Sequence, residues 1–171
     1  LHSCSKVIIT ADDQKKFMEV LSERMKDLRI GDPVNDTSFA GPLISKEAAK
    51  RFSQLAMENA GYVVAKAMPV MDAPGENYVA PIVLSGLDDE NDLNFMDSGL
   101  PILNIKVVGS LEEAFDEIQD TECGLSAGIF TKDPKVIDRF KSEVDVPYRY
   151  INESSRGLPA AYSSELTSFV R

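Results

Sequence analysis

Short β-branched runs alternate with amphipathic segments of helical spacing along most of this chain, and that alternation restricts the possible folds more than any other feature. It predicts strands at residues 6–10, 62–67, 78–84, 102–108, 126–130 and 148–152. Helices are predicted between them, and helices of about ten residues that connect strands form βαβ units with parallel strands. We therefore predict an α/β fold with a mostly parallel, twisted sheet covered by helices.

The predicted helices have recognisable starts. Ser45 is a capping residue type, Ser110 and Glu113 form a capping box, and Asp133 precedes a proline at the first helical position. The first helix is predicted at residues 12–28. Its inner face is predicted to consist of Phe17, Val20, Leu21, Met25 and Leu28.

One predicted strand, at residues 78–84, is interrupted by Pro81. Proline cannot donate a ladder hydrogen bond, so we expect this strand to be irregular or to lie at a sheet edge. A turn rich in proline and glycine connects it to the strand at 62–67, which suggests a hairpin.

Length and charge exclude several classes of protein. The chain has 171 residues, a size that suits one globular domain with a real core. Its net charge of -10 is spread along the chain, so nucleic acid and anionic membrane surfaces are not expected partners. No stretch approaches the roughly 20 apolar residues that span a bilayer, and we expect a soluble protein.

Cysteine usage indicates a reducing compartment. Only Cys4 and Cys123 are present, with a single histidine, which excludes a disulfide framework and a Cys/His metal cluster. We expect two free thiols, no metal site and, since no signal sequence begins the chain, a cytoplasmic location. The first residue is Leu rather than Met, so the chain is expected to be a piece of, or processed from, a longer polypeptide.

Several motifs occur in a particular order. Ile30-Gly31-Asp32-Pro33 is followed by Gly41-Pro42-Leu43-Ile44-Ser45, and later by the run from Cys123 to Asp133, which reads CGLSAGIFTKD. Asn152 ends the last predicted strand. In type and order these motifs resemble the catalytic domain of the NAD(P)-dependent aldehyde dehydrogenase family, collinearly from Lys6 to about Asn152. We accordingly assign residues 1–152 to an aldehyde dehydrogenase-like catalytic domain and residues 153–171 to an irregular C-terminal tail.

The resemblance implies a reaction and a cofactor. The family oxidises an aldehyde to a carboxylic acid through a Cys thiohemiacetal, hydride transfer to NAD or NADP, and hydrolysis by a water that a Glu activates. The family's Rossmann-type half, its general base and its oxyanion Asn precede the region that these residues match. We therefore expect that this chain alone binds no cofactor and is inactive.

The nucleophile position is the first departure from the family. The family's Cys stands about five residues before the basic residue that opens the strand, which here is Lys6, so counting back places Leu1 there. Cys4 is a candidate nucleophile if the loop is shifted by one or two residues. The favoured reading of Cys4 is a small buried thiol. His2, two residues away, could be the acid–base partner of Cys4. The favoured reading of His2 is a residue of a disordered chain terminus.

The second departure lies in the family's Glu-x-Phe-Gly-Pro motif, whose Glu holds the nicotinamide ribose and whose Phe packs by the nicotinamide. Residues 97–101 match it, so Asp97 is a candidate cofactor ligand on a shorter arm, while Gly99 removes the aromatic contact. The favoured reading of Asp97 is a solvated loop residue. The acidic run at 88–92 is likewise read as a solvated loop, because it lacks the ligand spacing of a calcium site.

Two functional hypotheses follow. In the first, the chain is an aldehyde dehydrogenase-like oxidoreductase domain, inactive alone. In the second, it is a non-catalytic, stand-alone module that binds a small molecule or a protein partner. Sheet edges and helix faces that meet other parts in the family would leave an apolar patch, so the expected partners are a second copy of the chain or a separate cofactor-binding half.

Overall fold

The computed structural model describes residues 4–34, 38–68, 75–120 and 126–153. The described residues form two compact units, a larger one at 4–120 and a smaller one at 126–153. Within these residues, no helix combines the length and the apolar character that crossing a membrane requires. The tail predicted from residue 153 lies outside the described residues, apart from Glu153.

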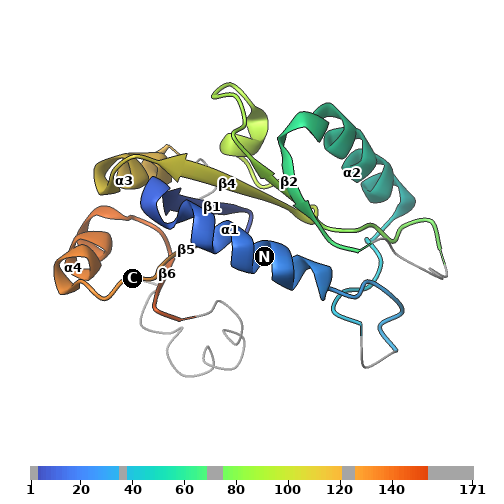
Figure 1. Ribbon diagram of the computed structural model, residues 1–171, viewed down its shortest axis with the longest axis horizontal. Helices are drawn as coiled ribbons and strands as arrows, with labels where there is room; N and C mark the ends of the chain where they lie inside the picture. Colours follow the sequence, from blue (N-terminus) through green and yellow to red (C-terminus); the bar gives the residue numbers. More distant parts are fainter. Residues whose placement is uncertain (1–3, 35–37, 69–74, 121–125, 154–171) are drawn as a thin grey trace. The chain divides into compact units, whose positions relative to one another are not determined.

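The larger unit is built on a four-stranded sheet of order β1-β4-β3-β2. Its elements in chain order are β1 (Lys6–Thr10), α1 (Ala11–Lys26), α2 (Lys46–Glu58), the 3-10 turn η1 (Ala60–Tyr62), β2 (Val63–Lys66), β3 (Ile82–Ser85), the 3-10 turn η2 (Asp92–Asn94), β4 (Ile102–Val108) and α3 (Leu111–Gln119) (Figure 1). β4 pairs in parallel with both β1 and β3, whereas β2 is antiparallel to β3. The predicted α/β class with a mostly parallel sheet is confirmed.

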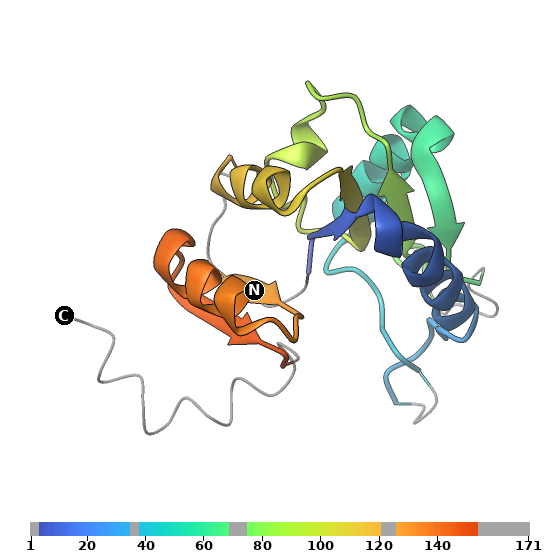
Figure 2. The ribbon, with the colours of Figure 1, turned by 60° about the vertical axis from the view of Figure 1, so that its left-hand side comes forward.

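Alternate residues of the strands supply two separate hydrophobic clusters, because successive side chains of a strand point to opposite faces. Val83 and Ile105 pack with Met25 of α1 on one face. Leu84 and Ile102 pack with Phe52 of α2 on the other face. Figure 2 shows α1 and α3 on opposite sides of β1 and β4. Both faces of the parallel strands are therefore covered, as the βαβ pattern predicts.

The helix starts lie where the sequence predicts them. The Ser45 hydroxyl accepts from the Ala48 N–H at 3.1 Å, and the Ser110 hydroxyl accepts from the Glu113 N–H at 3.1 Å. The Glu113 carboxylate accepts from the N–H of Gly109 at 2.8 Å, one residue before the N–H that a capping box uses.

One detail of the prediction was confirmed in part and another was wrong. The strand predicted at 78–84 is irregular, as one of the two alternatives predicted, because residues 78–81 are not part of a strand and β3 begins only at Ile82. The other alternative, an edge position, is not found: β3 is internal, and Pro81 contributes only its carbonyl, which accepts from the Ala67 N–H at 2.9 Å. Val20 is half exposed, and Met18 joins the core contacts of α1 in its place. The antiparallel pairing of β2 with β3, expected of a hairpin, is confirmed.

The smaller unit contains β5 (Ser126–Ile129), α4 (Pro134–Glu143) and β6 (Tyr148–Ile151). β5 and β6 pair in parallel, and Asp133 caps α4 through the Lys135 N–H at 2.9 Å. Phe140 of α4 is fully buried. The Asn152 side chain accepts from the Thr131 N–H and donates to the Thr131 carbonyl, both at 2.9 Å, so it ties the ends of the two strands together.

Candidate functional site

The two candidate site residues of the larger unit lie before the amino ends of neighbouring parallel strands. Cys4 stands just before β1, and Asp97 lies in the segment 86–99 that leads to β4. The Asn104 N–H of β4 donates to the Ser5 carbonyl at 2.9 Å, which extends the pairing of the two strands back toward Cys4. The parallel register of β1 and β4 therefore brings together two segments that are far apart in sequence.

Cys4 does not have the surroundings of an activated nucleophile. Its side chain is exposed, not buried as the favoured reading predicted, and its Sγ–H donates to the Lys6 carbonyl at 3.1 Å. Neighbouring atoms nevertheless crowd the sulfur enough for desolvation to raise the pKa of the thiol, and the negative charge of Asp97 raises it further. A nucleophilic cysteine needs the thiolate, so this raised pKa works against that role.

Asp97 forms a local turn. Its Oδ1 accepts from the Gly99 N–H at 2.9 Å while the side chain stays exposed, and the neighbouring Ser98 hydroxyl accepts from the Leu100 N–H at 3.2 Å. Gly99 has a φ of 67°, a left-handed conformation that glycine adopts without strain. No atom lies within 4 Å of the position of a Cβ there, so the space beside Gly99 is open.

Buried polar side chains hold the segment 86–99 against the sheet, although sequence reasoning assigned its acidic run to a solvated loop. Asn94 and Asn104 are each only 3% exposed, and the Asn104 amide donates to Asn94 Oδ1 at 3.0 Å. Lys6 Nζ donates to the Asn94 carbonyl at 2.7 Å and forms an ion pair with Glu117 of α3. Amide side chains inside otherwise apolar runs were the signal for this network in the sequence. The acidic side chains at 88–90 remain exposed, as predicted.

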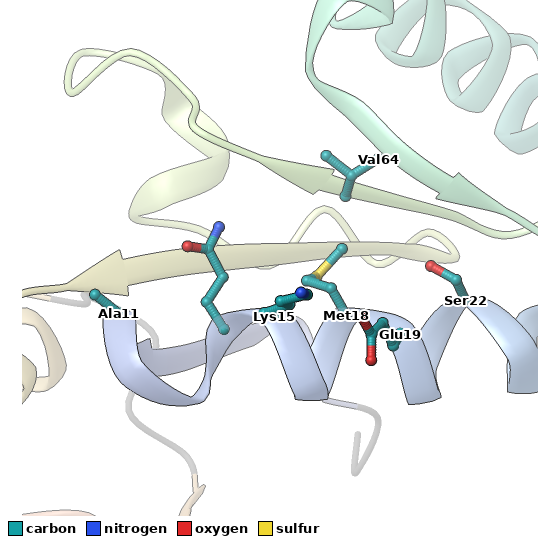
Figure 3. A pocket seen from close by; sticks show the side chains of 7 residues that line it. Ala11, Lys15, Met18, Glu19, Ser22 and Val64 are labelled. Carbon is teal, nitrogen blue, oxygen red and sulfur yellow. The ribbon is translucent and has the colours of Figure 1, made fainter.

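Two open hollows lie on the surface of the larger unit. One, of about 590 Å³, lies between α1 and β2, where Met18 and Val64 approach each other beside Lys15 and Glu19 (Figure 3). The other, of about 710 Å³, lies between α2 and the segment 86–99 and includes Ser98. Neither hollow is lined by Cys4 or Asp97.

Several candidate positions cannot be placed. Leu1, at the family's nucleophile position by counting, lies outside the described residues with His2 and Cys123. Among the residues that the structure describes, no group of three or more His, Cys, Asp or Glu side chains could hold a metal ion.

Comparison with known proteins extends the resemblance seen in the motifs. The model of the aldehyde dehydrogenase family matches residues 2–163. D-glyceraldehyde dehydrogenase (NADP(+)) from Thermoplasma acidophilum is 26% identical over 170 residues, which cover 94% of this chain and 34% of that protein. The chain spans about a third of the length of the curated relatives that it matches first.

Solved structures agree in fold. Proline utilization A from Bdellovibrio bacteriovorus superimposes with a TM-score of 0.80 and 25% identity, over 90% of this chain and 16% of that one. Betaine aldehyde dehydrogenase from Staphylococcus aureus, in complex with NAD+, gives a TM-score of 0.79 and 20% identity, over 88% of this chain and 31% of that one. With the family model matched along nearly all of its length, the chain belongs to the aldehyde dehydrogenase family.

Proposed function

We propose that this chain contributes the catalytic-domain portion of an NAD(P)-dependent aldehyde dehydrogenase and has no dehydrogenase activity by itself. The observation that carries the proposal is the state of Cys4. It is the only thiol that the structure describes, and desolvation raises its pKa rather than lowering it. Among the residues that the structure describes, an added aldehyde would therefore meet no thiolate prepared for attack.

Cofactor chemistry would come from outside these 171 residues. Betaine aldehyde dehydrogenase was solved with NAD+, and the Thermoplasma relative is named for NADP+. In this chain Asp97 is the group that we propose to meet a cofactor ribose, because it occupies the position of the family's Glu and its carboxylate is exposed. The turn formed with Gly99 uses one of its two oxygens, which leaves acceptor capacity for a hydroxyl.

The direct test is complementation. The chain would be mixed with a separately produced polypeptide that carries the nucleotide-binding half, the nucleophilic Cys and the general-base Glu of a relative, and aldehyde-dependent NAD(P)H formation would be followed. The proposal expects activity in the mixture and none in either component. A mixture that associates but stays inactive would count against it.

A second candidate, a non-catalytic module, is favoured by one feature of the same turn. The left-handed φ of Gly99 is a conformation that a phenylalanine rarely adopts, so the turn has departed from the family's motif in backbone as well as in side chain. Such a module would bind NAD+, NADP+ or a protein without turnover. Calorimetric titration of the isolated chain with each dinucleotide would separate this candidate from the first.

We also propose that another polypeptide, a second copy or a separate cofactor-binding half, covers part of the larger unit. In the described residues β2 pairs only with β3, and the hollow between β2 and α1 is lined by the apolar side chains of Val64 and Met18. Unpaired strand edges and apolar side chains together favour association. Light scattering coupled to gel filtration would test self-association, for which a mass of 18.8 kDa at all concentrations would be the contrary result.

A further inference from the structure

Two polar side chains stand side by side on the neighbouring strands β1 and β4. The parallel register pairs Lys6 of β1 with Asn104 of β4. Directly paired residues of neighbouring strands project their side chains to the same face of a sheet. Both reach the same residue, Asn94 of η2, which is therefore held from two strands.

Asn104 holds Asn94 through its side chain. The Asn104 amide nitrogen donates to Asn94 Oδ1 at 3.0 Å and to the Leu93 carbonyl at 3.3 Å. The Asn94 amide nitrogen in turn donates to the Asp88 carbonyl at 2.8 Å, a bond between two residues of the segment 86–99. A buried amide without these partners would be strongly disfavoured, so the arrangement permits few alternatives.

The Lys6 side chain holds the main chain of Asn94. Its ammonium donates to the Asn94 carbonyl at 2.7 Å and is paired with Glu117. This is a charge-assisted bond to a backbone group, and it fixes the chain at the residue where η2 ends. The two strands therefore restrain both the side chain and the backbone of one loop residue.

The restraint extends to Asp97. The Met96 N–H donates to the Asp92 carbonyl at 3.1 Å, and on the far side the Pro101 carbonyl accepts from the Ile82 N–H at 3.1 Å. The short turn from Asp97 to Leu100 therefore lies between two residues with main-chain hydrogen bonds, Met96 and Pro101.

We propose that Asn104 and Lys6 are positioning residues of this site: by holding Asn94 from two strands, they keep the Asp97 carboxylate beside Cys4. The inference rests on the proposed function, in which the Asp97 carboxylate meets a cofactor ribose. Neither residue touches a reacting group itself. Each residue holds Asn94, and through Asn94 it fixes where the Asp97 carboxylate lies.

The experiment uses the pKa of Cys4 to report how close the Asp97 carboxylate lies. In a Cys123→Ser background Cys4 is the only thiol, and the pH midpoint of its alkylation by iodoacetamide reports its pKa. Asp97→Asn should lower the midpoint, since one nearby negative charge is removed. With Asn104→Leu already present, Asp97→Asn should shift the midpoint by less than half as much.

Two further variants separate positioning from general stability. Val83→Ala removes core volume on the opposite face of the sheet, against α1, and should leave the effect of Asp97→Asn intact although the protein is destabilised. Asn94→Ala breaks the same anchor from the loop side and should reproduce Asn104→Leu. If Asp97→Asn shifts the midpoint equally in all four backgrounds, the proposal is overturned. Since no cofactor or aldehyde is used, a failure of the proposed dehydrogenase function would leave this outcome unchanged.

Discussion

Replacing Lys6 by methionine tests how much the buried ion pair contributes to stability. The Lys6 and Glu117 side chains are 11% and 18% exposed, so the pair is closer to the buried extreme than to the surface. Breaking a fully buried pair costs about 3–5 kcal/mol and an exposed pair about 0–1 kcal/mol. For this intermediate burial, and with the bond to the Asn94 carbonyl also lost, we expect a loss of about 2 kcal/mol.

The assay is urea unfolding followed by far-ultraviolet circular dichroism, because the chain contains no tryptophan. Lys106→Met is the matched control. Lys106 also lies in the sheet, but its partner Asp89 is 92% exposed, so the loss should stay below about 1 kcal/mol. The double variant Lys6→Met, Glu117→Leu should recover part of the loss, since no carboxylate then remains. A Lys6→Met protein that is no less stable than the Lys106→Met protein would contradict this expectation.

Other consequences can be checked in the same way. Gly99→Ala should destabilise the protein by about 1 kcal/mol through its left-handed φ alone, whereas Gly61→Ala, with equally open space and no positive φ, should not; equal urea midpoints would contradict this. Leu84→Ala should cost about 3 kcal/mol because Leu84 is completely buried in β3, against less than about 0.5 kcal/mol for Val20→Ala at its half-exposed site. The pKa of Tyr62 is raised because its hydroxyl donates to Asp88, so that bond stabilises the fold fully below the pKa of an unfolded tyrosine and is lost as pH rises through the higher folded value. Asp88→Asn should therefore lower the Tyr62 pKa in an absorbance titration of tyrosinate, and an unchanged titration would show that the bond is absent.

Local patterns in the sequence were sufficient for most of the fold. β-branched runs located the strands, and the capping chemistry of Ser45, Ser110 and Asp133 located helix starts, because both depend on neighbours in the chain. The edge position expected from Pro81 was not found, because this proline precedes the strand instead of lying within it. A proline that immediately precedes a strand needs to supply only its carbonyl to the ladder, so it is compatible with an internal position.

The site could be predicted only in part. Cys4 and Asp97 were identified separately from the family's motifs, but their electrostatic interaction depends on the parallel pairing of β1 with β4, which the sequence does not specify residue by residue. The anchorage of the segment 86–99 was missed for the same reason. Asn94 and Asn104 look like ordinary polar residues until the sheet register places one against the other.

The most direct test of the account is aldehyde-dependent reduction of NAD+ and NADP+ by the purified chain alone, over a panel of aliphatic and aromatic aldehydes. Circular dichroism would first establish that the chain is folded, and Cys4→Ser would serve as the control. We expect NAD(P)H formation no faster than with the control, because the Cys4 thiol, with its raised pKa, is not prepared to attack. Turnover that disappears in the Cys4→Ser variant would contradict it and would identify Cys4 as the nucleophile.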